Sequence, residues 1–265
     1  MLVDSHCHVM PDQLALAIRR FFDQRMGWGR LAYEGVRVAD VVEAQREAGS
    51  HRFWALPYAH KAGVAAQLNE WVARDVAPLA GAVAAATFHP DDEDILAIIE
   101  RAFDGLSLRL AKLHCSVGKF GVDDQRLSPL WEAAQERGVP VVVHVGRAVS
   151  GHTYAHELTP LEPVAAAYPR LKLVIAHCGL PGIDAALELL ERHPALCADL
   201  TSAAEWTFPL PVERLEALHE RIFFGSDCPN TTLTLVESRQ WLARQGLSDR
   251  ALRAILGENA ARLIP

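Results

Sequence analysis

The sequence contains no long apolar run and no cluster of basic residues. No apolar stretch approaches the roughly 20 residues that a membrane-spanning helix needs. The 26 Lys and Arg residues are outnumbered by 33 Asp and Glu residues, which gives a formal net charge of −7. Because nucleic acids and anionic membranes bind basic surfaces, this balance argues against both as partners. The first residues lack the basic and apolar segments of a secretion signal, so we expect a cytoplasmic protein.

The sequence also lacks the features of a disulfide framework and of a nucleotide-binding loop. Its cysteine count of five is odd, which argues against full disulfide pairing. Four thiols directly follow a His or Asp residue: Cys7, Cys115, Cys178 and Cys228. Because side chains alternate across a strand, we expect these thiols to be buried behind the polar side chains that precede them. No glycine-rich loop joins a strand to a helix, which argues against a doubly wound nucleotide-binding sheet.

Eight short apolar segments alternate with segments of helical periodicity. The predicted strands are Leu2–Val9, His51–Pro57, Leu79–Phe88, Gly105–His114, Pro140–Val145, Leu171–His177, Leu196–Leu200 and Arg221–Ser226. The central ones are continuous apolar runs, as expected of parallel strands that are buried on both faces. Eight such units in about 250 residues are typical of a TIM-type barrel. We therefore predict an α/β fold in which residues 1–265 form a single (β/α)8 barrel domain.

The connection from Met10 to Arg37 is unusually long for a barrel of this kind. A helix is predicted within it over Leu14–Gln24, and several aromatic residues follow. The pattern leaves two interpretations open. The segment forms a lid or wall of the binding pocket, or it is a peripheral helix packed on the barrel.

Ionisable side chains stand at the ends of most of the predicted strands. His6 and His8 are two residues apart, so they share one face of the first strand. The other strand-end residues are His89, Lys112, His114, His144, His177 and Asp227. The active sites of such barrels lie at the C-terminal ends of the strands. Because imidazole and carboxylate groups are suitable ligands for zinc, we predict a metal site at that end of the barrel.

This order of residues resembles that of the amidohydrolase superfamily. The segments DSHCHVMP, VVVHVG, LVIAHCG, FGSDCP and ILGENAARL are similar to those of its amidohydrolase-2 branch, which holds metal-dependent hydrolases, lactonases and non-oxidative decarboxylases. The resemblance implies one divalent metal, with zinc as the expected ion, bound by His6, His8, His144 and Asp227. It also implies that His177 lies beside the metal-bound water or the substrate as a hydrogen-bonding or proton-transfer group.

We expect a metal-dependent hydrolase that acts on the carbonyl of an amide, ester or lactone. A zinc-bound water loses its proton near neutral pH, and Asp227 is suited to accept that proton as a general base. The alternative is a non-oxidative decarboxylase of an unsaturated or aromatic carboxylic acid on the same site. A binding protein without chemistry is a third interpretation, against which the retained ligand set argues.

Four further residues are predicted to contact a small, anionic substrate. Arg147 is suited to bind a carboxylate through its bidentate guanidinium group. Lys112 attracts an anion if it is a plain ammonium; if it is carboxylated, it bridges two metals, and His144 and His177 bind the second one. His114 and His89 are predicted to face the substrate as well. If the chain associates, a homodimer is the expected form, since it is the commonest soluble oligomer.

Overall fold

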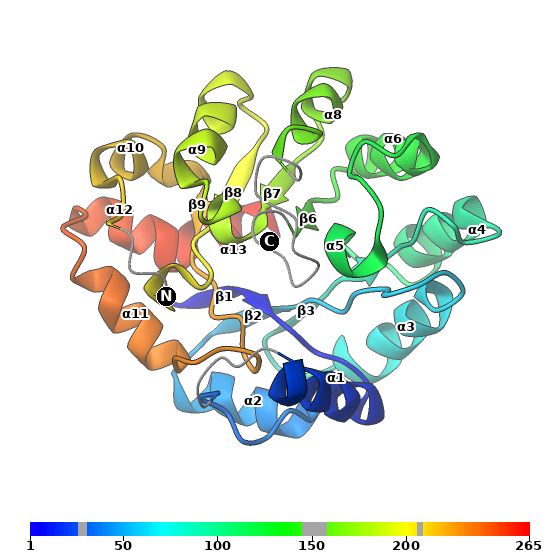
Figure 1. Ribbon diagram of the computed structural model, residues 1–265, viewed down its shortest axis with the longest axis horizontal. Coiled ribbons are helices and arrows are strands. Elements are labelled where there is room, and N and C mark those ends of the chain that lie inside the picture. The colour runs from blue at the N-terminus through cyan, green and yellow to red at the C-terminus, as the bar shows by residue number, and fades with distance from the viewer. Residues whose placement is uncertain (26–30, 145–157, 206–208) are drawn as a thin grey trace.

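The computed structural model describes residues 1–25, 31–144, 158–205 and 209–265 of the chain. Its strands are β1 (Val3–Cys7), β2 (Arg52–Ala55), β3 (Ala82–Ala84), β4 (Ala86–Thr87), β5 (Ala111–Leu113), β6 (Val141–Val143), β7 (Leu173–Ile175), β8 (Cys197–Asp199) and β9 (Ile222–Phe223). They lie at the centre of the molecule, and helices surround them (Figure 1). The predicted barrel of parallel strands alternating with helices is confirmed.

The helices that follow the strands agree in order with the predicted ones. They are α1 (Asp12–Arg25), α2 (Val38–Glu47), α3 (Ala65–Trp71), α4 (Ile95–Glu100), α5 (Cys115–Gly118), α6 (Ser128–Arg137), α8 (Leu161–Ala167), α9 (Ile183–Arg192), α10 (Val212–Ala217), α11 (Leu235–Ala243), α12 (Asp249–Arg253) and α13 (Asn259–Leu263). π-Helical turns extend α3, α4 and α12 over Val72–Val76, Arg101–Gly105 and Ala254–Glu258. Short 3-10 turns cover Gln125–Leu127, Ala176–Gly179, Ala203–Glu205 and His219–Arg221. Within the described residues, no helix combines the length and apolar character that a membrane crossing requires.

The barrel closes where the segment after β9 runs beside β1. The backbone N–H of Ser5 donates to the carbonyl of Phe224 at 2.9 Å, and the N–H of His8 donates to Cys228 at 2.7 Å. Cys7 and Cys228 form a parallel bridge between these contacts. The closure therefore brings the segment that contains Asp227 alongside the segment that contains His6 and His8.

The third predicted strand, Leu79–Phe88, is in fact two strands that have different partners. β3 pairs with β2, whereas β4 pairs with β5. The change occurs at Ala85, whose N–H still bonds to Ala55 on β2, while the N–H of Ala86 bonds to Leu110 beside β5. One continuous strand was the wrong prediction, because apolar periodicity does not report where a strand exchanges its partner.

Asn69 on α3 bonds to the backbone that this exchange leaves without a strand partner. Its amide donates to the carbonyl of Thr87 at 3.0 Å and accepts from the Thr87 N–H at 2.8 Å. Asn69 is almost completely buried. Since buried backbone groups need hydrogen-bond partners, this side chain stands in for the missing strand at that point.

The interior of the barrel is filled by apolar side chains on or next to the strands. These residues are Val3, Trp54, Leu56, Val83, Ala85, Leu110, Val142, Val174, Ala176, Cys197 and Phe223, and they form a cluster with Ala260 and Ile264 near the C-terminal end of the chain. A separate and larger cluster packs the strands against the helices. The apolar layer fills the barrel below the polar strand ends, as in TIM-type barrels.

A β-bulge in β1 decides which of its side chains face the interior. Between Asp4 and Cys7 the register of β1 against β2 shifts by one residue. Simple alternation from Val3, which points inward, would turn His6 outward. The extra residue reverses this order, so that His6 faces the interior and Cys7 packs in the outer core.

We expect replacement of Asn69 by Leu to lower the free energy of unfolding by about 2–4 kcal/mol, because two buried backbone groups lose their partners. Gln67→Leu on the exposed face of the same helix is the matched control and is expected to change it by less than about 0.5 kcal/mol. Urea unfolding followed by circular dichroism measures both. Equal stabilities of the two variants would contradict the role of Asn69.

Candidate metal centre

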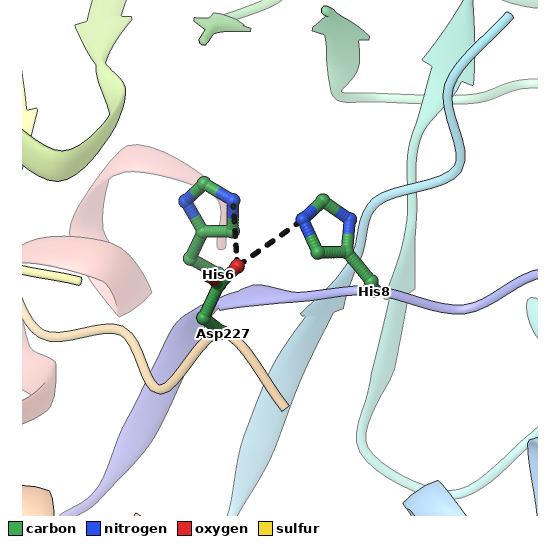
Figure 2. Close-up of side chains that lie close together, drawn as sticks. All are labelled: His6, His8 and Asp227. Carbon is green, nitrogen blue, oxygen red and sulfur yellow. Dashed lines mark ion pairs between the residues drawn. The ribbon is translucent and has the colours of Figure 1, made fainter. Parts of the chain in front are cut away.

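Three side chains meet at the C-terminal ends of β1 and β9. Nε2 of His8 lies 3.2 Å from Oδ1 of Asp227, and Nε2 of His6 lies 3.7 Å from the same oxygen. The ligand atoms of these three residues are all within 4.8 Å of one another. Figure 2 shows the two imidazole rings, from one strand, placed around the carboxylate of the neighbouring segment.

The other ring nitrogens of both histidines are already in use. Nδ1 of His8 is 3.0 Å from the carbonyl oxygen of Leu56, which can only accept a hydrogen bond. Nδ1 of His6 is 3.0 Å from Oδ2 of the buried Asp199 carboxylate. Both Nδ1 atoms therefore carry a proton, and in the neutral form of each imidazole the Nε2 atom directs its lone pair toward Asp227.

This arrangement fits a divalent metal ion. Two nitrogen lone pairs and a carboxylate oxygen at these distances favour a cation among them, and Nζ of Lys112, 3.3 Å from Nε2 of His6, supplies only part of that positive charge. Oδ1 of Asp227 is buried and has no hydrogen-bond donor among the described residues. Two imidazoles and one carboxylate are the ligand set of many catalytic zinc sites, which keep a further position open. His6, His8 and Asp227 are thus the residues that would hold the ion.

Three more histidines and one tyrosine continue from these ligands into a closed ring. Successive ring centroids are 5.1 Å apart for His8 and His6, 4.9 Å for His6 and His177, 4.8 Å for His177 and His144, 3.9 Å for His144 and His114, 4.9 Å for His114 and Tyr58, and 5.3 Å for Tyr58 and His8. We call these six residues the aromatic cluster; they lie at or just beyond the C-terminal ends of the strands.

His144 lies on the opposite side of the aromatic cluster from His8. It is stacked on His114 with an angle of 17° between the ring planes. Neither of its ring nitrogens has a hydrogen-bond partner in the described part of the chain, and burial lowers its pKa well below the usual value. The structure places His144 outside the group of three converging ligand atoms, so its role as a fourth ligand stays a prediction.

Lys112 lies directly beside the ligands, inside the barrel. Its side chain is completely buried on β5, and its Nζ is 3.3 Å from Nε2 of His6. Burial lowers the pKa of Lys112 to about 8, against the attraction of the Asp199 and Asp227 carboxylates. Burial and the charge of Lys112 lower the pKa of His6 to about 3, which keeps that imidazole neutral, the form that binds metals.

Two of the predicted substrate contacts are placed elsewhere or lie outside the description. His89 is buried, its Nε2 donates to the carbonyl of Gly118 at 3.0 Å, and its Nδ1 accepts from the N–H of Asp91 at 3.2 Å. These bonds connect the segment of His89 and Asp91 to the segment of Gly118, and they leave neither ring nitrogen free to bind a ligand. Arg147 lies outside the described residues, as do His152 and His156. Substrate contact by His89 and Arg147 stays a prediction.

The sequence analysis missed Asp199 and Tyr58. Asp199 stands at the end of the apolar run of β8. The other site residues were identified by this same position at a strand end, but Asp199 was not. Tyr58 directly follows the predicted strand His51–Pro57, which is the same signal, but it was not identified. Asp4 points away from the aromatic cluster and accepts hydrogen bonds from Gln45 and Ser226. Burial raises the pKa of Asp4 to about 6.

Several solved structures share the fold of this chain over nearly their full lengths. A 5-carboxyvanillate decarboxylase from Novosphingobium aromaticivorans, complexed with manganese and 4-hydroxy-3-methoxy-5-nitrobenzoic acid, is 11% identical, with 99% of this chain and 95% of that chain covered and a TM-score of 0.74. A 2,6-dihydroxybenzoate decarboxylase from Rhizobium is 14% identical, with coverage of 99% and 98% and a TM-score of 0.68. A 4-oxalomesaconate hydratase from Rhodopseudomonas palustris is 18% identical, with coverage of 99% and 95% and a TM-score of 0.64.

The family comparison covers the barrel from its first strand to its last residue. A search of curated proteins found no sequence that matches this chain. The family model described as Amidohydrolase matches residues 3–265, a span that includes all the strand-end residues discussed above. The resemblance noted in the sequence is thereby confirmed, and this chain belongs to the amidohydrolase family, in its amidohydrolase-2 branch.

Proposed function

We propose that this protein is a metal-dependent, non-oxidative decarboxylase of a small unsaturated or aromatic carboxylic acid. The observation that carries the proposal is the buried cation Lys112 beside the three converging ligands. A bound divalent ion and the Lys112 ammonium would carry three positive charges, and the carboxylates of Asp199 and Asp227 carry two negative ones. Counting only the described residues at this centre, one positive charge would remain. A substrate with one carboxylate would neutralise that excess, whereas an amide or lactone that carries no carboxylate would not.

The activities of structurally similar proteins support the same choice. Two of the three structures described above are named as decarboxylases of aromatic acids, and the third is named as a hydratase. The decarboxylase alternative therefore has better support than the hydrolase that we expected first. Manganese in one of these structures also widens the choice of metal beyond zinc. Two imidazoles and a carboxylate are suitable ligands for either ion.

A bound divalent ion would supply an electrophile that holds the anionic substrate and withdraws electron density from it. Lys112 neutralises part of the substrate charge in a buried site. Loss of carbon dioxide leaves the electron pair of the broken C–C bond on the substrate carbon, and a proton must then form a new C–H bond there. We propose His177 as the donor of that proton; its ring lies between those of His6 and His144, which supports this role.

Release of carbon dioxide from a panel of hydroxybenzoic and unsaturated carboxylic acids, in the presence of Mn²⁺ or Zn²⁺, tests the proposal directly. We expect at least one acid to be converted into its decarboxylated product. Asp227→Asn is expected to abolish the reaction while the circular dichroism spectrum stays unchanged, because the carboxylate ligand is lost. Turnover of amides, esters or lactones without any release of carbon dioxide would instead favour the hydrolase.

His177→Gln is expected to lower kcat by about 100-fold to 10,000-fold, because a positioned proton donor contributes rate factors of that size. The metal content should stay at the wild-type value, since His177 lies outside the group of converging ligand atoms. His219→Gln, at the opposite end of the barrel, is the control and should leave kcat unchanged. An unchanged kcat in His177→Gln would remove this residue from the proton transfer.

Lys112→Met is expected to lower kcat/KM for the carboxylate substrate by about 10-fold to 100-fold, the range for loss of a charged hydrogen bond of about 1.5–3 kcal/mol. Lys61→Met on the exposed surface is the control for the change of net charge. Steady-state kinetics with saturating metal measures both variants. If Lys112→Met instead lowers the metal content from two ions per chain, Lys112 is the carboxylated bridge.

A further inference from the structure

We propose that Asp199 is a positioning residue that couples the metal ligand His6 to the proton-transfer residue His177. The inference rests on the metal site of the proposed function. Asp199 ends β8, between the strands that lead to His177 and Asp227. Its carboxylate is completely buried and faces the interior of the barrel beneath the aromatic cluster.

The two oxygens of this carboxylate bond in two different directions. Oδ2 accepts a hydrogen bond from Nδ1 of His6 at 3.0 Å. Oδ1 accepts from the backbone N–H of His177 at 2.9 Å and from the N–H of Thr201 at 3.1 Å. One side chain therefore contacts both a ligand and the residue proposed to deliver the proton.

The bond to His6 favours one nitrogen of that imidazole for metal binding, and Nζ of Lys112, 3.3 Å from Nε2, favours the same one. A carboxylate accepts the Nδ1 proton and so leaves the lone pair on Nε2, the atom that faces His8 and Asp227. Carboxylates that accept from ligand histidines orient the ring and increase its basicity, and their loss typically weakens metal binding by about 10–100-fold.

The bond to His177 holds a backbone conformation that few residues adopt. His177 has φ 57° and ψ 15°, and Cys178 has φ 45° and ψ 36°, so two consecutive non-glycine residues are left-handed. Such conformations persist where the surrounding structure fixes them. Acceptance of the His177 N–H by Oδ1 of Asp199 is one of those constraints, and it aims the ring toward His6 and His144.

Asp199→Asn and Asp199→Ala separate the two roles. In Asp199→Asn the two backbone N–H groups require the amide oxygen on their side, so the amide NH₂ faces His6. That NH₂ favours the His6 tautomer that is protonated on Nε2, and it does so against the opposing charge of Lys112 Nζ, 3.3 Å from Nε2. We expect the affinity for Mn²⁺ and for Zn²⁺ to fall by about 10–100-fold. At saturating metal, kcat should return to near the wild-type value, because His177 keeps its acceptor. Asp199→Ala loses both bonds, so its kcat should stay low even at saturating metal.

Metal affinity is measured on the full chain by competition with a chelator, and the His6 tautomer is read from ¹⁵N spectra of histidine-labelled protein before and after addition of Zn²⁺. Metal-stripped wild type should show Nδ1–H at His6, and Asp199→Asn should show Nε2–H. Asp4→Asn is the control: Asp4 is an equally buried carboxylate that contacts the His6 backbone but no imidazole, so its loss should lower the melting temperature without changing the tautomer.

The outcomes distinguish this inference from the proposed function. A wild-type protein that binds neither Mn²⁺ nor Zn²⁺ would overturn the metal site itself. A wild type that binds metal, together with an Asp199→Asn variant of equal affinity and unchanged tautomer, would overturn only the role of Asp199. If Asp199→Ala does not fold, the tautomer in wild type and in Asp199→Asn still decides the question.

Discussion

The convergence of two imidazole lone pairs and a carboxylate oxygen inside the barrel is the constraint on which the rest of the site depends. His6, His8 and Asp227 direct two ring nitrogens and one carboxylate oxygen, all electron-rich atoms, toward one point. Asp199 and the carbonyl of Leu56 keep both imidazoles in the tautomer that donates away from that point. A divalent cation is the simplest group that makes the arrangement favourable, and the proposed function builds on it.

Backbone irregularities, more than regular secondary structure, bring these groups together. The bulge in β1 turns His6 inward, and closure of the barrel through Cys7 and Cys228 sets Asp227 beside it. Asp227 has φ 63° and His177 has φ 57°, so both adopt the left-handed conformation that non-glycine residues rarely do. Such strain costs of order 1–3 kcal/mol per residue, and the closely packed and hydrogen-bonded surroundings of the strand ends offset it.

The sequence predicted the barrel and the polar residues at its strand ends because those features follow from local patterns, whereas the resemblance to the amidohydrolase superfamily singled out His6, His8 and Asp227 among them as expected ligands. Apolar runs alternate with helical segments, and each of the three ligands stands where such a run ends. The division of the third strand, the bulge and the contacts of His89 could not be predicted, because each depends on which distant segment lies alongside. Asp199 was the exception: it ends an apolar run like the other residues, yet its importance becomes clear only from the atoms that it contacts.

The most direct test of the account is a crystal structure of the protein with Zn²⁺, in which anomalous scattering locates the ion. The account predicts one peak about 2.0–2.2 Å from Nε2 of His6, Nε2 of His8 and an oxygen of Asp227, the usual distances for such ligands. A peak between His114 and His144 alone, or crystals that bind no metal while His6 and His8 keep their positions, would contradict it.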